Sequence, residues 1–153
     1  MKRHIGTKLI NAKPMTRAEY NIFRGWGLPA DENGFDDGFL VEYVDGGAAN
    51  TEEYSGYVSW SPKDVFERAY KPIDGLPFGL AIDALKQGLR VARSGWNGKG
   101  MWLELIGSSD YQIESMDKQL LPWIGIKTAD DKFAPWPASQ TDILSEDWII
   151  LKD

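Results

Sequence analysis

The residues best suited to bind a ligand lie between Arg93 and Trp102. This stretch, RSGWNGKGMW, contains three glycines, an Asn-Gly pair, two cations and two tryptophans. An Asn-Gly pair between apolar segments predicts a type I′ hairpin turn, in which both turn residues have positive φ. The exposed N–H groups of such a turn can form a concave anion site. The stretch therefore predicts a site for a planar, phosphorylated ligand. The alternative is a tight turn whose tryptophan fills the core.

Four side chains of this stretch are candidate ligand-binding residues. Trp96 is expected to keep one face exposed, and a nucleobase stacked on an indole contributes ~1–3 kcal/mol. Arg93 can bind a phosphate through two parallel hydrogen bonds, whereas Lys99 acts as a point charge. Asn97 lies between them in the sequence. The alternative is that Trp96 caps the end of the sheet and that the two cations are ordinary surface charges.

A second candidate group begins 43 positions after Trp96, at Ser139, Gln140, Thr141 and Asp142. Polar side chains and free N–H groups at the start of a predicted helix can contact a ligand. Asp142 can accept a hydrogen bond from a ribose hydroxyl or a base N–H. The alternative is that Ser139 or Thr141 serves only as the N-cap of the helix.

The composition leaves few routes to catalysis. The chain has no cysteine, and its only histidine is His4. A thiolate nucleophile, a histidine-based zinc site and a Ser-His-Asp triad are therefore disfavoured. The acidic pairs at 130–131 and 146–147 lie in polar contexts, with no apolar pocket to raise a pKa. We expect no enzymatic activity, no metal and no cofactor; the alternative is a hydrolase that uses Asp142 or Asp147.

The charge pattern favours a small anionic ligand over a nucleic acid. The net charge of −6 argues against binding to DNA or RNA, which usually requires a basic face. From Ala84 to Leu103, however, there are four cations and no acid, which gives a local positive field. No segment has the ~20 apolar residues of a membrane span, and the start lacks the apolar region of a signal peptide. We expect a cytoplasmic protein.

The hydrophobic pattern predicts an α+β fold with mainly antiparallel sheets and a few short helices, in two small modules. Thr16 and Glu19 predict a capping box, Ser61 an N-cap before Pro62, and Gly88 a helix C-terminus. Strands are expected at 2–13, 39–44, 56–60, 89–92, 101–106, 120–127 and 147–151, with helices at 17–24, after 61, at 78–87 and shortly before 145. The Pro- and Gly-containing segment 71–77 predicts a linker between modules 1–72 and 76–153.

Four segments of the second module resemble a known family. They are AIDALKQG at 81–88, VARSGWNGKGM at 91–101, IKTAD at 126–130 and WPASQTDILSEDW at 136–148. By these segments and their order, residues 76–152 resemble the Thoeris anti-defence sponge family of phages, in the second of its named types.

The resemblance implies binding without catalysis. Members of the family sequester cyclic ADP-ribose isomers made by Thoeris immune sensors, and some also bind cyclic oligonucleotides of the CBASS system. They assemble as homotetramers with ligand pockets at subunit interfaces. In this sequence, Trp96 matches the base-stacking residue and Ala138–Asp142 matches part of the same pocket. The implied place of action is the cytoplasm of the infected host cell.

The first module resembles a different segment, found in phage proteins of unknown role. The matching motifs are NAKPMT at 11–16, RGW at 24–26, LVEY at 40–43 and SWSP at 59–62. Its role stays open, and an interaction of residues 1–72 with a host protein is a further alternative function.

Overall fold

The computed structural model describes residues 1–98, 100–113 and 120–151. The chain divides into two compact units, Met1–Lys71 and Pro72–Asp153, and each is described by itself. Both are built from short helices and one antiparallel sheet, which confirms the predicted α+β class. Within the described ranges, no helix is long and apolar enough to cross a membrane.

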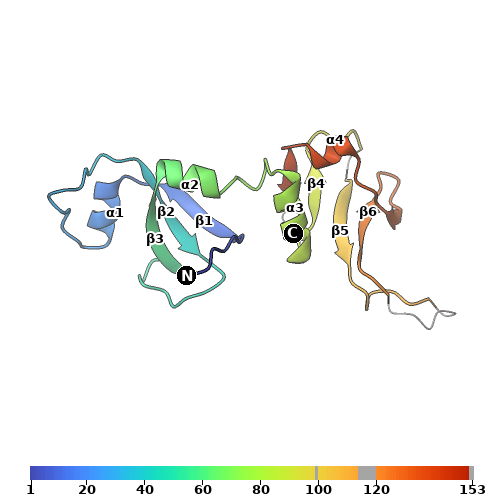
Figure 1. Cartoon of the computed structure of the whole chain (residues 1–153), viewed down its shortest axis with the longest axis horizontal. Coiled ribbons are helices and arrows are strands. Elements are labelled where there is room, and N and C mark those ends of the chain that lie inside the picture. Colours follow the sequence, from blue (N-terminus) through green and yellow to red (C-terminus); the bar gives the residue numbers. More distant parts are fainter. Residues whose placement is uncertain (99, 114–119, 152–153) are drawn as a thin grey trace. The chain divides into compact units, whose positions relative to one another are not determined.

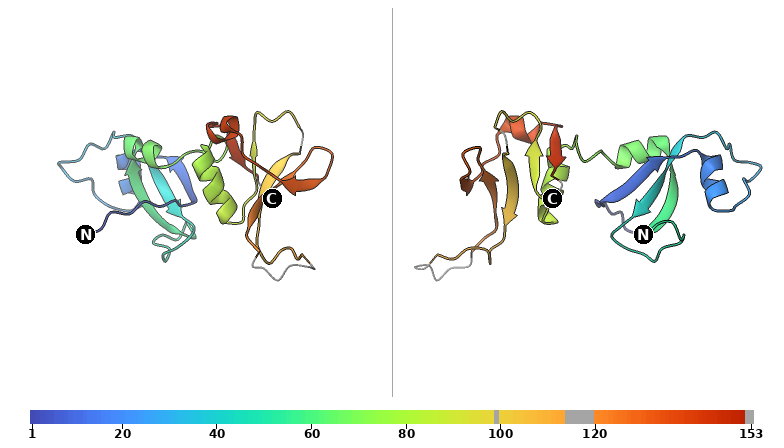
Figure 2. Two further views of the ribbon diagram at one scale, coloured as in Figure 1. Left: turned by 45° about the vertical axis from the view of Figure 1, so that its right-hand side comes forward. Right: turned by 180° about the vertical axis from the view of Figure 1, so that it is seen from behind.

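The first unit is a three-stranded sheet with two helices. Its elements are β1 (Ile10–Pro14), α1 (Arg17–Phe23), β2 (Gly38–Tyr43), β3 (Tyr57–Pro62) and α2 (Lys63–Ala69). The strands are antiparallel in the order β1-β2-β3. The helix α2 contacts β2 and β3, as the two views of Figure 2 show.

Local signals explain most of this unit. Thr16 and Glu19 form the predicted capping box at the start of α1. Tyr20 of α1 then packs with Leu40 and Val58 of the sheet in a small buried core. The first strand starts later than predicted, at Ile10. The predicted N-cap at Ser61 is wrong, because β3 continues to Pro62 and α2 begins without a side-chain cap.

The second unit is a five-stranded sheet. Its elements are α3 (Phe78–Lys86), β4 (Val91–Arg93), β5 (Trp102–Ile106), β6 (Trp123–Lys127), β7 (Phe133–Pro135), α4 (Gln140–Ile143) and β8 (Trp148–Ile150). The strand order is β7-β6-β5-β4-β8, and every pair is antiparallel. The last strand thus lies beside β4, and Arg93 is opposite Trp148.

One helix covers the core of this sheet. Figure 1 shows α3 beside β4, and α3 also contacts β5 and β8. Leu85 of α3 is fully buried together with Val91, Leu103 and Trp148 of the sheet. The helix ends one residue earlier than predicted, and Gly88 follows with a φ of +81°. That left-handed conformation is the reason for a glycine at this position.

The connection between β4 and β5 differs from the predicted hairpin. The described residues between β4 and β5 (94–98, 100 and 101) belong to no strand, and Asn97 and Gly98 do not have the positive φ values of a type I′ turn. The positive φ occurs instead at Gly100, at +70°. The prediction of a type I′ turn at Asn97-Gly98 is therefore wrong. Near the start of the connection, the backbone N–H of Ser94 donates to the backbone carbonyl of Asp147, in the segment before β8.

Candidate ligand-binding site

Arg93, at the end of β4, joins the two candidate segments. Its Nη1 donates to Oδ1 of Asp142 at 2.9 Å, and its Nε donates to Oδ1 of Asp147 at 2.9 Å. The arginine side chain is only 15% exposed, so the guanidinium lies largely inside this cluster. The sheet makes the contact possible because β8, which follows both carboxylates in the chain, pairs directly with β4.

Asp147 binds the start of the connection between β4 and β5, just before the Asn97-Gly98 pair at which the sequence predicts an anion site. Its Oδ2 accepts the backbone N–H of Gly95 at 3.0 Å and lies 3.5 Å from the hydroxyl of Ser94. Its backbone carbonyl accepts the N–H of Ser94 at 3.0 Å. A Cβ on Gly95 would lie 2.8 Å from Oδ2, so a glycine is what permits this approach. The first turn of the loop is therefore bound to the protein's own carboxylate.

Asp142 fixes the second segment. It forms a capping box with Ser139 at the start of α4: the Ser139 hydroxyl donates to Asp142 Oδ2 at 2.6 Å, and the Asp142 N–H donates back to that hydroxyl at 3.1 Å. Its backbone carbonyl also accepts the indole N–H of Trp148 at 3.0 Å. Ser139 is thus the N-cap, which is the alternative that the sequence left open for it.

Trp96 lies against a cluster of aromatic rings. Its ring packs edge to face with Trp148 at a centroid distance of 5.6 Å and with Trp136 at 6.3 Å. Phe78 of α3 contacts both of these tryptophans. Trp96 is half-buried at the edge of this core, so the packing fixes its orientation while part of its ring stays accessible. A fixed, partly exposed indole is suited to stack on a planar ligand.

The ion-pair cluster is held in its charged state. Hydrogen bonds from Arg93 lower the pKa of Asp147 below its ordinary value. Burial alone would raise the pKa of Asp142, but hydrogen bonds from Ser139 and Arg93 outweigh it and lower that pKa. The two carboxylates in turn raise the pKa of Arg93. The cluster carries one arginine against two carboxylates, so its net charge is negative.

The other candidate residues lie at the surface around this cluster. Asn97 is exposed in the loop, and Gln140 and Thr141 are exposed in the first turn of α4. Lys99 lies outside the described residues. The structure therefore brings Arg93, Trp96 and Ser139–Asp142 into one connected region.

Three further side chains of this region were not among the candidate ligand-binding residues. Trp136 and Trp148 support Trp96, and both lie in the WPASQTDILSEDW segment. Lys127 of β6 places its Nζ 3.7 Å from where a Cβ on Gly100 would be, so it adds a cation beside the loop. Its pairing with exposed Asp131, at 3.1 Å, is of the weak surface kind. The sequence alone does not indicate that Lys127 lies here, because its position follows from the pairing of β6 with β5.

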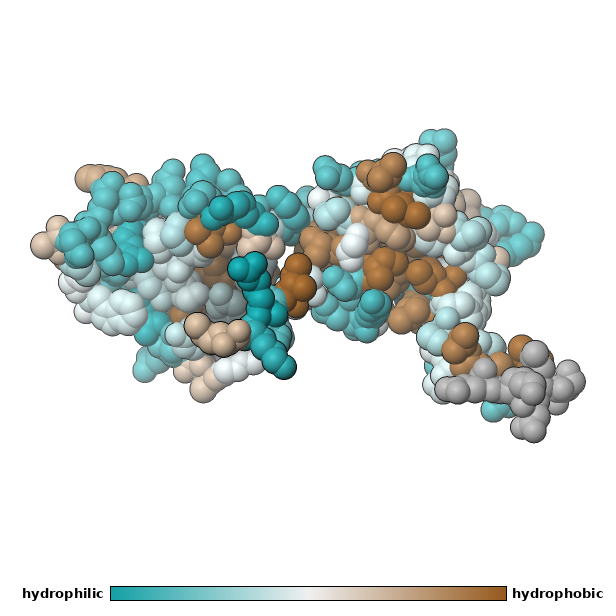
Figure 3. Space-filling view, viewed as in Figure 1, coloured by the Kyte–Doolittle hydropathy of each residue, from teal (hydrophilic) through white to brown (hydrophobic). Residues whose placement is uncertain are grey.

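Apolar side chains are exposed next to Asp142. Ile143 is 46% exposed and Leu144 is 79% exposed at the end of α4, and Figure 3 shows apolar surface over this helix. Exposed apolar patches of this kind commonly mark interaction surfaces.

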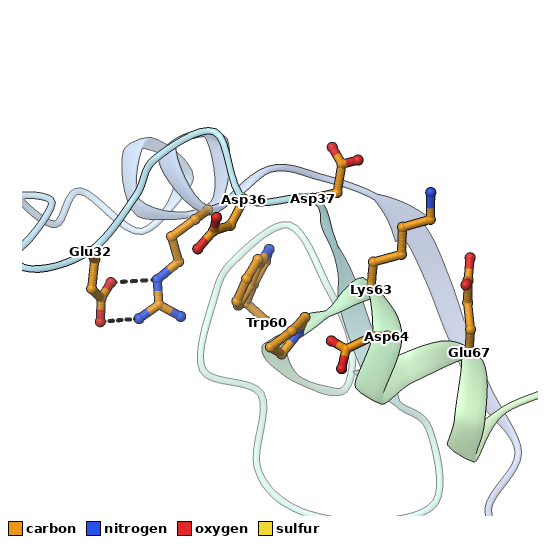
Figure 4. A pocket seen from close by; sticks show the side chains of 9 residues that line it. Glu32, Asp36, Asp37, Trp60, Lys63, Asp64 and Glu67 are labelled. Carbon is orange, nitrogen blue, oxygen red and sulfur yellow. Dashed lines mark hydrogen bonds and ion pairs between the residues drawn. The ribbon is translucent and has the colours of Figure 1, made fainter.

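A separate hollow of about 680 Å³ lies in the first unit. Figure 4 shows Trp60 in its wall, with the carboxylates of Asp36 and Asp64 nearby. Arg17 stacks over the Trp60 ring at 4.8 Å and pairs with Glu32. The lining residues are Arg17, Glu32, Asp36, Asp37, Trp60, Pro62, Lys63, Asp64 and Glu67. Five carboxylates against two cations give this hollow a negative charge.

The comparisons with known proteins point to the second unit. Residues 76–151 match the family model of the Thoeris anti-defense 2-like domain. The chain is also similar to a protein named Thoeris anti-defense 2 from Bacillus phage SP01, with 46% identity over 84 residues. That alignment covers 50% of this chain and 94% of the phage protein. The matched residues include β4, the loop 94–101 and α4, which together form the candidate site.

Proposed function

The chain belongs to the Thoeris anti-defense 2 family, and on that premise we propose that it binds a cyclic nucleotide immune signal and sequesters it without cleaving it. The ligand is a cyclic ADP-ribose isomer or a cyclic oligonucleotide. An anti-Thoeris role follows from the family, and sequestration is the chemistry that the candidate site favours. Such a protein acts where the signal is made, in the cytoplasm of the host cell.

The observation that carries this proposal is the ion pair between Arg93 and Asp142. It connects two segments that lie 49 positions apart and that both fall within the family match. One segment contributes the partly exposed ring of Trp96, and the other contributes the polar start of α4. A ring for stacking next to hydroxyl, amide and carboxylate groups is a combination that suits a nucleotide.

The chemistry of the same residues disfavours the hydrolase alternative. A general acid requires a carboxyl group whose pKa is raised toward neutrality. Asp142 and Asp147 have lowered pKa values instead, because Arg93 and Ser139 bind their charged forms. Among the described residues, no cluster of acidic, histidine or cysteine side chains is arranged to hold a metal ion. These features support binding in preference to turnover.

Assembly into a homo-oligomer, a tetramer by resemblance to the family, is part of the proposal. The exposed apolar residues Ile143 and Leu144 adjoin Asp142, so a second subunit that covers them would also lie next to the site. Sedimentation equilibrium of the purified chain tests this part. A monomer at micromolar concentration would contradict it.

The main experiment measures the fate of the ligand. The purified chain is mixed in molar excess with cyclic ADP-ribose isomers, each in turn, and with cyclic oligonucleotides, and free ligand is measured by mass spectrometry after ultrafiltration. We expect the free concentration of at least one ligand to fall, and heating the protein to release that ligand unchanged. Release of a cleaved product would contradict sequestration, and undiminished free ligand in every mixture would contradict binding.

A matched pair of variants assigns the binding to the candidate site. Trp96→Ala removes the proposed stacking surface, so we expect the loss of ligand depletion. Trp26→Ala removes an indole that is 54% exposed in the first unit, and we expect depletion to be unchanged. Equal depletion by the wild-type protein and Trp96→Ala would remove Trp96 from the site.

A further inference from the structure

Arg93 is occupied by the protein's own carboxylates. Two of its nitrogens donate to Asp142 and Asp147 at 2.9 Å, and a third lies 3.5 Å from Asp147. These bonds use the edges of the guanidinium that would otherwise clamp a phosphate. Because the two carboxylates outnumber the arginine, the cluster repels a further anion. Arg93 therefore has a different task from the phosphate contact that its sequence position predicts.

That task concerns the path of the loop. Asp147 binds the loop at two successive residues, through its carbonyl to the N–H of Ser94 and through its carboxylate to the N–H of Gly95. Trp96 is the next residue. Its own N–H donates to the carbonyl of Arg93 at 3.3 Å, so both sides of the Arg93–Asp147 pair are bound to the backbone that carries the indole.

The cluster also contacts a ring against which the Trp96 indole packs. Asp142, the second partner of Arg93, accepts the indole N–H of Trp148 through its carbonyl. Trp148 is fully buried and packs against Trp96. The cluster thus sets both the backbone from which Trp96 extends and a ring against which it packs.

We infer that Asp147, through Arg93 and the loop N–H groups, is a positioning residue that orients the Trp96 indole for ligand stacking and makes no ligand contact itself. The inference rests on the proposed function, since it assigns a role at the same site. It differs from the sequence-based expectation in that Arg93 supports the site from inside the protein instead of binding a phosphate.

The test is Asp147→Asn, which keeps the size of the side chain and removes its charge. The matched control is Glu146→Gln, which makes the same charge change at the exposed neighbouring residue. Affinity is measured by calorimetry with the cyclic ADP-ribose isomer or cyclic oligonucleotide that the wild-type protein depletes. We expect Asp147→Asn to bind it 10- to 100-fold more weakly and Glu146→Gln to bind within twofold of the wild-type protein.

A spectroscopic measurement on the ligand-free protein separates positioning from direct contact. The indole N–H resonance of Trp96, identified by its absence from Trp96→Phe, is compared among the variants. We expect Asp147→Asn to shift or broaden it and Glu146→Gln to leave it unchanged. Weaker binding with an unchanged Trp96 resonance would overturn the inference in favour of a direct contact. Unchanged or tighter binding by Asp147→Asn would also overturn it, because a freed Arg93 would then be the phosphate ligand.

A second variant keeps the test independent of folding. If Asp147→Asn does not fold, Arg93→Lys is used; it retains the charge but loses the forked bonds, and we expect a loss of affinity with the same change in the Trp96 resonance. Arg93→Lys with wild-type affinity and an unchanged resonance would overturn the inference. If the wild-type protein itself binds none of the tested ligands, the proposed function is contradicted. If the wild-type protein binds a ligand and these variants behave like Glu146→Gln, only the positioning role is contradicted.

Discussion

Gly95→Ala tests the contact between the loop and Asp147 in the absence of any ligand. The φ of Gly95 is not positive, so alanine fits the backbone and only its methyl group matters. That Cβ would lie 2.8 Å from Oδ2 of Asp147, whereas ordinary contacts begin near 3.4 Å. The carboxylate must therefore retreat by several tenths of an ångström. The Gly95 N–H bond, now 3.0 Å long, is stretched toward the limit of a hydrogen bond.

The expected cost follows from two opposing effects. A hydrogen bond to a charged group contributes about 1.5–3 kcal/mol to the free energy of unfolding. Replacing glycine with alanine restricts the unfolded chain and returns about 0.4–1 kcal/mol. We therefore expect Gly95→Ala to lower the free energy of unfolding by about 1–2 kcal/mol. With a urea dependence of about 1–3 kcal/mol per molar, the midpoint falls by about 0.5–1 M.

The assay is urea unfolding followed by tryptophan fluorescence, since five of the seven tryptophans lie in residues 72–153. The matched control is Gly79→Ala in α3, where a Cβ would meet nothing within 4 Å. Alanine in a helix is favoured over glycine by about 0.5–1 kcal/mol, so the control moves the midpoint upward. A Gly95→Ala protein as stable as the wild type would show that the Asp147 contact does not restrain the loop.

Three further outcomes are expected. Because the pKa values of Asp142 and Asp147 are lowered in the folded protein, the stabilisation from their cluster is complete above the ordinary Asp pKa of about 3.9. It is lost as the pH falls through the folded pKa values. The urea midpoints at pH 6 and pH 3 should therefore differ less in Asp147→Asn than in the wild type, and an equal difference would refute this. Leu103→Ala, at a fully buried position, should lower the free energy of unfolding by about 2–5 kcal/mol in the same urea assay; a change below 1 kcal/mol would contradict the core assignment. Gly38→Ala should destabilise the first unit by about 1–3 kcal/mol, because its Cβ would lie 2.4 Å from the Trp60 ring. Hydrogen exchange of the β2 backbone amides measures this, and unchanged protection of these amides would count against the prediction.

The features that could be predicted from the sequence are those set by nearby residues. The Thr16–Glu19 capping box needs only a hydroxyl and a carboxylate three residues apart, and Gly88 needs only the end of an amphipathic helix before it. Both are present. The same local reasoning failed at Asn97-Gly98, where the turn signal was the strongest in the chain. The positive φ lies instead at Gly100, and Asp147 binds the same connection nearer its start, at Ser94 and Gly95.

The candidate site likewise combines features set by neighbouring residues with features set by residues far apart in the sequence. Trp96 and Ser139–Asp142 could be selected from the sequence because a glycine-rich stretch and a helix-cap motif can each be recognised from a few neighbouring residues. Asp147 could not be given its role, because its partner Arg93 lies 54 positions away and is reached only once β8 pairs with β4. Arg93 has the charge and shape of a phosphate ligand, and our inference that it has another role rests on the two carboxylates that face it. The residue type indicates which groups a side chain can bind, and the strand order determines which of those groups lie within bonding distance.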